Sequence, residues 1–381
     1  VGSLCLDANT TGTLNTAVGR SAMSTNTTGN NNTAVGYATM LFNETGSENS
    51  SFGYNTLAAN TTGSNHVAIG RSALASNTTA SNNTAVGRNA LTANTTGDVN
   101  TAVGSYALDA NTTGYNNTAV GNHALGDGTN IDYVVAIGFN ALKANQADYN
   151  TAVGSEALEA NTTGTANIAI GFRTLEANTT GTSNTAVGYA AAQSITTGTD
   201  NTAFGSLSGV AITTGQYNTA IGKESLEAST TADHNNALGY QALHTCTTGN
   251  KNTALGSHSM TAVSTGSENV GVGYWSLGAG TMTADENTAI GSHCMFSNTS
   301  SSYNTAVGNQ SLYSNTTGSM NVAMGHQALY TNTTGSYNVA VGVYALDHNT
   351  TASHNTAVGY GVLTANTTGN ANTGIGDSCL W

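Results

Sequence analysis

The sequence predicts an all-β fold, a parallel β-solenoid (β-roll) of about 22 turns with 17 residues in each turn. Three observations support this fold class. Twenty-three glycines, from Gly2 to Gly376, recur at a nearly constant spacing, so that the first and the last lie 22 × 17 residues apart. Apolar residues stand at a fixed phase in nearly every repeat, which disordered chains lack. Glycine recurs too densely for helices, and no 3.6-residue apolar stripe persists.

The repeat runs through the whole chain, which predicts one β-solenoid segment over residues 1–381. One interval is 16 residues (Gly138 to Gly154) and one is 18 (Gly273 to Gly291), and these two slips cancel. Both ends fall inside a repeat, without the polar capping unit that a free solenoid end needs for solubility. We therefore expect the segment to be part of a longer chain.

Each repeat can be numbered from its anchoring glycine, which is position 0, and residues 100–114 show the pattern without departure. It reads Asn-Thr-Ala-Val-Gly, two variable residues, Ala-Leu, two variable residues, Asn-Thr-Thr-Gly and two variable residues. The β-branched residues at −3 and −1 share one face of a strand, and we expect them to point inward. Leu or Met at +4 then supplies the opposite wall. We expect two short strands in each turn and positive φ at the glycines of positions 0 and +10.

Asparagine fills position −4 in 20 of the 22 repeats that contain it, with His66 and Val134 as exceptions. Stacked in register, such amides can hydrogen-bond from turn to turn. The sequence therefore predicts a structural ladder that includes Asn15, Asn32, Asn83, Asn100, Asn117, Asn184, Asn218, Asn304, Asn338 and Asn355.

A second asparagine column at position +7 is predicted to be at least half buried. Apolar or small residues replace it in successive central repeats, and a slot that accepts either Asn or Ile is shielded from water. The replacements are Ile195, Ile212, Ser229, Cys246, Val263 and Gly280.

Alanine at position −2 alternates with its β-branched neighbours, so we expect it on the outer face of the turn. Small side chains would let another sheet approach closely, which predicts a contact between protomers; the alternative is a crowded flank of the same turn. The contact residues would be Ala17, Ala34, Ala85, Ala102, Ala119, Ala186, Ala306 and Ala340.

Paired threonines at +8 and +9 admit two interpretations. Their hydroxyls can cap backbone groups at a corner, or they can form a flat array that binds ice. Adjacent residues on a strand point to opposite faces, which favours the capping interpretation. The recurring Asn-Thr-Thr triplets are also formal glycosylation acceptors, but packing explains their repetition better.

The composition excludes several function classes. A net charge of −13, from 20 acidic and 7 basic residues, argues against nucleic-acid binding. No apolar run is long enough to span a membrane. We find no spacing typical of a metal, cofactor or catalytic site, and expect no enzyme. The four cysteines are too far apart to form disulfides within the chain. Sixteen tyrosines stand mostly at variable bends, where they either stack between turns or offer contacts to carbohydrate or protein.

The repeat Thr-Thr-Gly-x-x-Asn-Thr-Ala-Val-Gly-x-x-Ala-Leu resembles the head repeat of trimeric autotransporter adhesins, and similar stretches occur in phage tail fibres. The resemblance covers essentially all repeats, although this repeat is longer by an Asn-Thr-Thr segment. It implies a left-handed β-roll, three chains side by side, and display outside the cell for attachment.

The expected function is that of a non-enzymatic extracellular structural fibre or adhesin shaft, on a cell surface or a virion. Such a shaft would be a rigid spacer whose partners are copies of itself and a host-surface glycan or protein. One alternative is a self-assembling filament subunit, whose exposed end strands pair with further copies. Another is a solenoid that binds ice or glycans through one ladder face.

Overall fold

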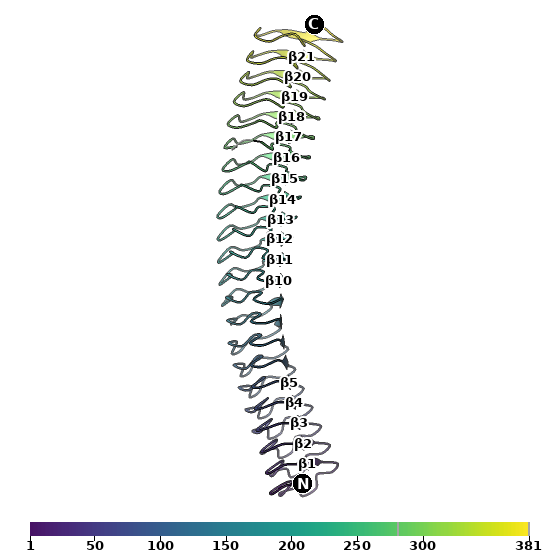
Figure 1. Ribbon diagram of the computed structural model, residues 1–381, viewed down its shortest axis with the longest axis vertical. Helices are drawn as coiled ribbons and strands as arrows, with labels where there is room; N and C mark the ends of the chain where they lie inside the picture. The colour runs from purple at the N-terminus through teal and green to yellow at the C-terminus, as the bar shows by residue number, and fades with distance from the viewer. Residues whose placement is uncertain (280–281, 380–381) are drawn as a thin grey trace. The chain divides into compact units, whose positions relative to one another are not determined.

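The computed structural model of the chain describes residues 1–279 and 282–379, and these residues contain strands and turns but no helix. The chain divides into two compact units, residues 1–184 and residues 185–381. In both units each turn contributes one strand of three residues, and the strands of consecutive turns pair in parallel (Figure 1). The predicted all-β parallel solenoid with about 17 residues per turn is confirmed.

The first unit holds the strands β1 to β10. Their bounds are Thr16–Val18, Thr33–Val35, Ser50–Phe52, Val67–Ile69, Thr84–Val86, Thr101–Val103, Thr118–Val120, Val135–Ile137, Thr151–Val153 and Ile168–Ile170. Pairing is in register: β5 and β6 place Ala85 opposite Ala102 and Val86 opposite Val103.

The second unit holds the strands β11 to β22. Their bounds are Thr185–Val187, Thr202–Phe204, Thr219–Ile221, Asn236–Leu238, Thr253–Leu255, Val270–Val272, Thr288–Ile290, Thr305–Val307, Val322–Met324, Val339–Val341, Thr356–Val358 and Thr373–Ile375. The 18-residue interval leaves the register intact, because β16 and β17 still place Gly271 opposite Ala289.

The face of the strand that points into the turn is the opposite of the one expected. Position −2 is buried and positions −3 and −1 are outside, as the strand β6 shows with a buried Ala102 and a Val103 that is 37% exposed. Position −2 lies against the long side chain at +4, as Gly271 does against Met260, so this part of the interior is filled by a methyl group. The alanines expected on the outside are all buried in their own turn: Ala17, Ala34, Ala85, Ala102, Ala119, Ala186, Ala306 and Ala340.

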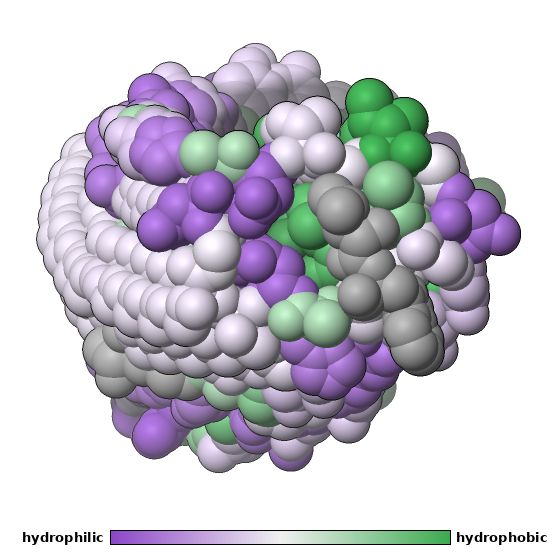
Figure 2. Space-filling model, turned by 90° about the horizontal axis from the view of Figure 1, so that it is seen from above, coloured by the Kyte–Doolittle hydropathy of each residue, from purple (hydrophilic) through white to green (hydrophobic). Residues whose placement is uncertain are grey.

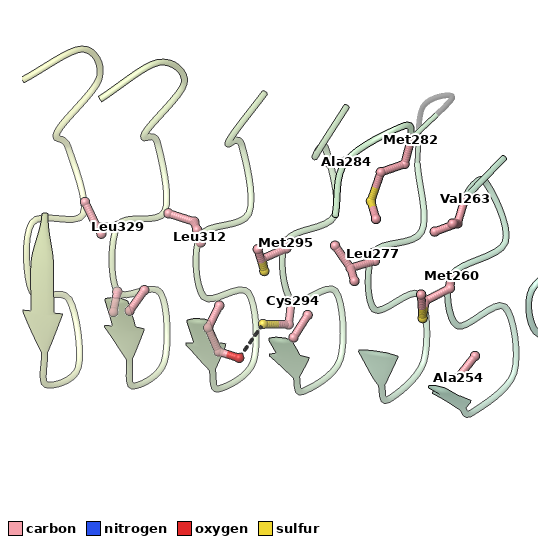
Figure 3. Packing of buried hydrophobic residues seen from close by; sticks show 14 of the residues in the cluster. Ala254, Met260, Val263, Leu277, Met282, Ala284, Cys294, Met295, Leu312 and Leu329 are labelled. Atoms are coloured by element: carbon pink, nitrogen blue, oxygen red, sulfur yellow. Dashed lines mark hydrogen bonds between the residues drawn. The ribbon is translucent and has the colours of Figure 1, made fainter. Parts of the chain in front are cut away.

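Leucine and methionine at position +4 do form the opposite wall of the core, as predicted. In the second unit, Met260, Leu277, Met295, Leu312 and Leu329 follow one another along the stack (Figure 3). Each lies over the buried position −2 and beside the small residue at +3. The core is thus a thin column of repeated side chains.

Each turn has one strand where two were expected. The rest of the turn contains three residues in the left-handed region, at positions +2, +4 and +12. In one turn these are Tyr106 (φ +58°), Leu108 (φ +52°) and Asn116 (φ +57°). The backbone N–H of Tyr106 donates to Arg88 O of the preceding turn, and the backbone N–H of Leu108 donates to Ala124 O of the following turn. Backbone groups outside the strand are therefore hydrogen-bonded along the stack as well.

Glycine is favoured for a different physical reason in each of the two glycine columns. Gly104, at position 0, has φ +143°, and a Cβ there would lie 2.3 Å from Gly121 O, so its predicted positive φ is confirmed. For Gly97, at position +10, the predicted positive φ is wrong. Its lack of a side chain serves close approach instead, because a Cβ would lie 2.1 Å from Gly114 O. Seven turns nevertheless hold another residue at this second position: Ala80, Ile131, Ala147, Ala232, Ala284, Ser301 and Ala352.

Side chains compensate for one another inside the core. Gly209 replaces leucine at +4, and a Cβ on it would lie 2.9 Å from Cδ1 of Ile212, which occupies the position +7 of the same turn. Ala192 and Ile195 form the same combination one turn earlier, and both are buried. The isoleucine thus fills the space that a shorter residue at +4 leaves empty.

Candidate binding surface

The outward positions −3 and −1 of the strands form a stripe in each unit, with mostly threonine at −3 and apolar residues at −1, and we call this surface the strand stripe. Val103, Leu238 and Ile170 belong to it and are 37%, 44% and 41% exposed. Position −3 holds Thr, Ser, Val, Ile or Asn, and position −1 holds Val, Ile, Leu, Phe or Met. Because consecutive strands pair in register, these side chains lie above one another in two rows.

The strand stripe carries no charge. None of the 20 acidic and 7 basic residues of the chain lies in any of the 22 strands. Large exposed apolar surfaces are uncommon on monomeric soluble proteins, which makes the strand stripe a candidate for an interaction surface. Its side chains are mainly Val, Ile and Thr, which offer shape and apolar area without an ionic partner.

Rows of aromatic rings flank the strand stripe at positions +1, +2 and −5. Tyr37 stacks on Tyr54 with ring centroids 5.3 Å apart, and Tyr133 stacks on Tyr149 at 5.6 Å. These ring contacts support the stacking interpretation of the tyrosines. Figure 2, which is seen from the C-terminal end, shows residues of similar hydropathy lying over one another in rows in the second unit.

The asparagine ladder at position −4 is confirmed, and its hydrogen bonds are more specific than amide stacking. Asn100 donates its backbone N–H to Oδ1 of Asn83, one turn earlier, at 2.8 Å, and its Nδ2 donates to Gly114 O at 2.8 Å. Each amide thereby joins consecutive turns twice. Asn15, Asn32, Asn83, Asn100, Asn117, Asn184, Asn218, Asn304, Asn338 and Asn355 all take part, with N···Oδ1 distances between 2.8 and 3.1 Å.

His66 substitutes for asparagine in this ladder as a neutral imidazole. Its Nε2 lies 2.7 Å from Ala80 O, and its Nδ1 accepts the backbone N–H of Asn83 at 3.2 Å. One ring nitrogen therefore replaces the amide donor and the other the amide acceptor. Burial lowers the pKa of His66 below its usual 6.5 and keeps this arrangement neutral.

The second asparagine column, at position +7, is buried as predicted and forms a direct side-chain ladder. Asn43 donates Nδ2 to Oδ1 of Asn26 at 2.8 Å, and Asn60 donates to Asn43 at 2.7 Å. The replacements Ile195, Ile212, Ser229, Cys246 and Val263 are buried too, whereas Gly280 lies outside the described residues.

The threonines at +8 act as corner hydroxyls, in agreement with the capping interpretation. Thr95 donates Oγ1 to Thr112 O of the next turn at 3.0 Å, and Thr333 donates to Thr350 O at 3.0 Å. These hydroxyls are therefore engaged with the backbone. The threonines of position +9, such as Thr96 and Thr334, are exposed, and those of position −3 also lie on the outside of the turn.

Two clusters of possible metal ligands occur among the described residues, at the same positions of two turns. They are Glu156, Glu159 and Glu176 in the first unit and Glu224, Glu227 and His244 in the second. Cations of the chain already lie against both: Arg173 Nε is 2.6 Å from Glu156 Oε2, and Lys223 Nζ is 3.0 Å from Glu224 Oε1. These acidic groups are accounted for as ion pairs along the bends.

The four cysteines are free thiols. Cys246 and Cys294 are buried in the second unit, and burial raises the pKa of their thiols to about 11 and about 12. Both are small residues of the core, whereas Cys5 and Cys379 are only half buried.

The described residues include no helix that could cross a membrane. No protein-family model matches this chain, and no curated protein matches it significantly.

Proposed function

We propose that the chain is a non-enzymatic extracellular structural fibre or adhesin shaft that associates with copies of itself through the strand stripe. The observation that carries this proposal is the stripe itself, which is uncharged and has an apolar residue at position −1 of every strand in each unit. A second copy carries the same rows with the same spacing between turns, so two stripes can meet along many turns. Such repeated contact would add interface area in proportion to the number of turns.

The resemblance to adhesin head repeats supports a trimer of this kind and a left-handed coil. The buried alanines cannot supply the contact that the sequence first indicated, so the outward Val, Ile and Thr take over that role. Association would bury side chains such as Phe52 and Phe204, which are 40% and 43% exposed in the single chain. Stiffness would follow from the continuous hydrogen bonding between turns, which suits a spacer.

The mass in solution tests this proposal. We expect sedimentation equilibrium to give three times the chain mass over a wide range of concentrations. The double variant Val103→Glu/Val120→Glu places two charges in the stripe and should lower the mass towards one chain, with unchanged circular dichroism. The control Thr92→Glu adds a charge at position +5, where Asp109 and Glu159 occur naturally, and should keep the trimer.

Two results would overturn parts of the proposal. A single-chain mass at all concentrations would remove self-association through the stripe. A mass that grows without limit as concentration rises would replace the closed shaft with the filament alternative.

Ice binding is a second candidate, and the corrected orientation of the strand favours it. Thr101 and Val103 point to the same side of β6, and nine of the 22 strands have this outward Thr-x-Val pattern. Thermal hysteresis of the double variant and of the unchanged chain would test it. Equal freezing points with and without the protein would exclude this candidate.

A further inference from the structure

A hollow of about 250 Å³ opens on the bends of the second unit, away from the strands. It is lined by Tyr344, Asp347, Tyr360, Gly361 and Thr364. The rings of Tyr344 and Tyr360 are 6.0 Å apart and nearly perpendicular, at 82°. They therefore form two walls at an angle to one another. The hollow is smaller than the pockets that hold drug-sized ligands, so it suits a single head group.

Gly361 opens this hollow through its missing side chain. It is the one glycine at position +2 in the whole sequence. Its φ of +57° is the value that residues with side chains adopt in the same column, such as Tyr344 at +60° and Gln327 at +54°. The backbone therefore does not require glycine here. What glycine provides is empty space between Tyr344 and Thr364, the residues at +2 of the preceding turn and +5 of the same turn.

The first unit shows what occupies the equivalent space when a side chain is present. Arg173 stands at the position of Gly361, Glu156 at that of Tyr344 and Glu176 at that of Thr364. The Nε of Arg173 lies 2.6 Å from Glu156 and 3.8 Å from Glu176. A guanidinium group thus fits the space between these two positions on the bends of this solenoid.

Tyrosines of the neighbouring columns serve as platforms for cations elsewhere in the chain. Arg88 lies over the ring of Tyr106 at 5.3 Å, and Lys223 lies over Tyr240 at 5.9 Å. Arg20 and Arg71 lie in the same way over Tyr37 and Tyr54, both at 5.8 Å. The ring face attracts a cation electrostatically, and more strongly when water is excluded.

Asp347 adds a carboxylate to the two rings. Its side chain is 16% exposed, and the hydrogen bond to its Oδ1 comes from Nδ1 of the exposed His348 at 3.0 Å. Burial raises its pKa above the usual value, because the charged form is partly desolvated. A cation in the hollow would favour the ionised form and receive charge-assisted hydrogen bonds.

We propose that the hollow formed by Tyr344, Asp347, Tyr360 and Gly361 binds the guanidinium group of an external ligand. The planar cation packs against the tyrosine rings and donates N–H hydrogen bonds to Asp347, in the place that Arg173 occupies in the first unit. The group can belong to a free small molecule or to the arginine side chain of a peptide. This site is separate from the strand stripe and does not depend on self-association.

Titration calorimetry of the full chain with methylguanidinium tests the proposal directly. We expect saturable binding with one site per chain, weaker binding of methylammonium, and none of neutral urea. A short peptide with one arginine and its citrulline counterpart distinguish the two sources. Tighter binding of the arginine peptide than of methylguanidinium would identify a protein ligand, and equal binding would identify a small molecule.

Three variants assign the binding to this hollow. Asp347→Asn should weaken methylguanidinium binding about tenfold, as expected for loss of one charge-assisted contact. Gly361→Arg should abolish binding, because its own guanidinium would fill the hollow as Arg173 fills the equivalent space. Gln327→Ser, a change in the same column two turns earlier, is the control and should bind normally. No saturable binding by the unchanged chain, or equal binding by all variants, would overturn the proposal.

Discussion

The least expected residues of this chain are those in the left-handed region that are not glycine. Val99 has φ +59° and is 51% exposed, at the position where most turns hold a polar residue. For a β-branched residue this conformation is a true outlier, and it costs about 1–2 kcal/mol. The surrounding hydrogen bonds hold it there: its N–H donates to Ser81 O of the preceding turn at 3.2 Å. Continuous hydrogen bonding along the stack therefore holds single residues in strained backbone conformations.

Relief of this strain should be measurable. Replacement of Val99 by Asn, which tolerates the left-handed region and occurs at this position as Asn82 and Asn116, should stabilise the chain by about 1 kcal/mol. Val103→Asn, four residues away in the extended strand β6, should destabilise it, because asparagine is unfavourable there. Urea unfolding of both variants provides the comparison, and a stability loss in Val99→Asn would contradict the role assigned to strain.

Residue types explain what could be predicted and what could not. The glycine period and the asparagine columns predicted the parallel stack, its register and its buried amides, because identical residues must lie above one another. The face of the strand that points inward could not be predicted, since Thr101, Ala102 and Val103 alternate without indicating which face is inside. The width of the interior decides that question. It depends on the left-handed conformation of Leu108, for which a leucine gives no local signal.

At the scale of one turn, the side chains at positions +4 and +7 fill one shared volume of the core, which we call a slot. The slot at +4 is empty at Gly209, and Ile212 extends into the space that is left. In most other turns leucine and asparagine divide the same volume. Stability should therefore depend on the pair and not on either residue alone.

A double-mutant cycle tests this coupling. Gly209→Leu alone should destabilise the chain by about 1–3 kcal/mol through overpacking against Ile212. Ile212→Asn alone should cost about 2–5 kcal/mol, because it leaves a cavity. Together they recreate the common Leu and Asn pair, so the combined loss should be smaller than the sum by about 1–3 kcal/mol. Additive losses in urea unfolding would show that the two residues do not share a slot.

The hollow at Gly361 is a similar case on the outside of a turn, because a missing side chain leaves space there as well. The sequence contained a signal for it, since no other repeat has glycine two residues after its anchoring glycine. The signal had no meaning without the structure, because glycine at a variable bend is ordinarily explained by the backbone. The observed φ at this column removes that explanation and leaves the missing side chain as the feature to be accounted for.

At the scale of the whole molecule, each turn contacts its neighbours along the stack, so stability is expected to be a sum over turns and the interfaces between them. The two buried thiols report whether turns nevertheless unfold together. Cys246 and Cys294 lie about three turns apart in the second unit, and burial raises the pKa of their thiols to about 11 and about 12. At pH 8 neither thiol is exposed or ionised enough to react in the folded state.

We expect a thiol reagent such as Ellman's to label Cys5 and Cys379 rapidly at pH 8 and the two buried thiols slowly. If the second unit unfolds cooperatively, Cys246 and Cys294 should react at the same rate, with the same dependence on urea. Single-cysteine variants, with serine at the other positions, separate the signals by mass spectrometry. Distinct rates would indicate turn-by-turn opening, and fast labelling of both without urea would contradict their burial.

The in-register pairing of strands has a consequence for how such a chain can change over generations. Most turns offer the same amide, methyl and carbonyl groups to the turn after them as they receive from the turn before them. Unequal recombination that adds or removes 17 codons between two such turns would therefore join two surfaces that already fit. Inherited variation in length requires no compensating substitution, and a lineage could adjust the reach of this protein one turn at a time.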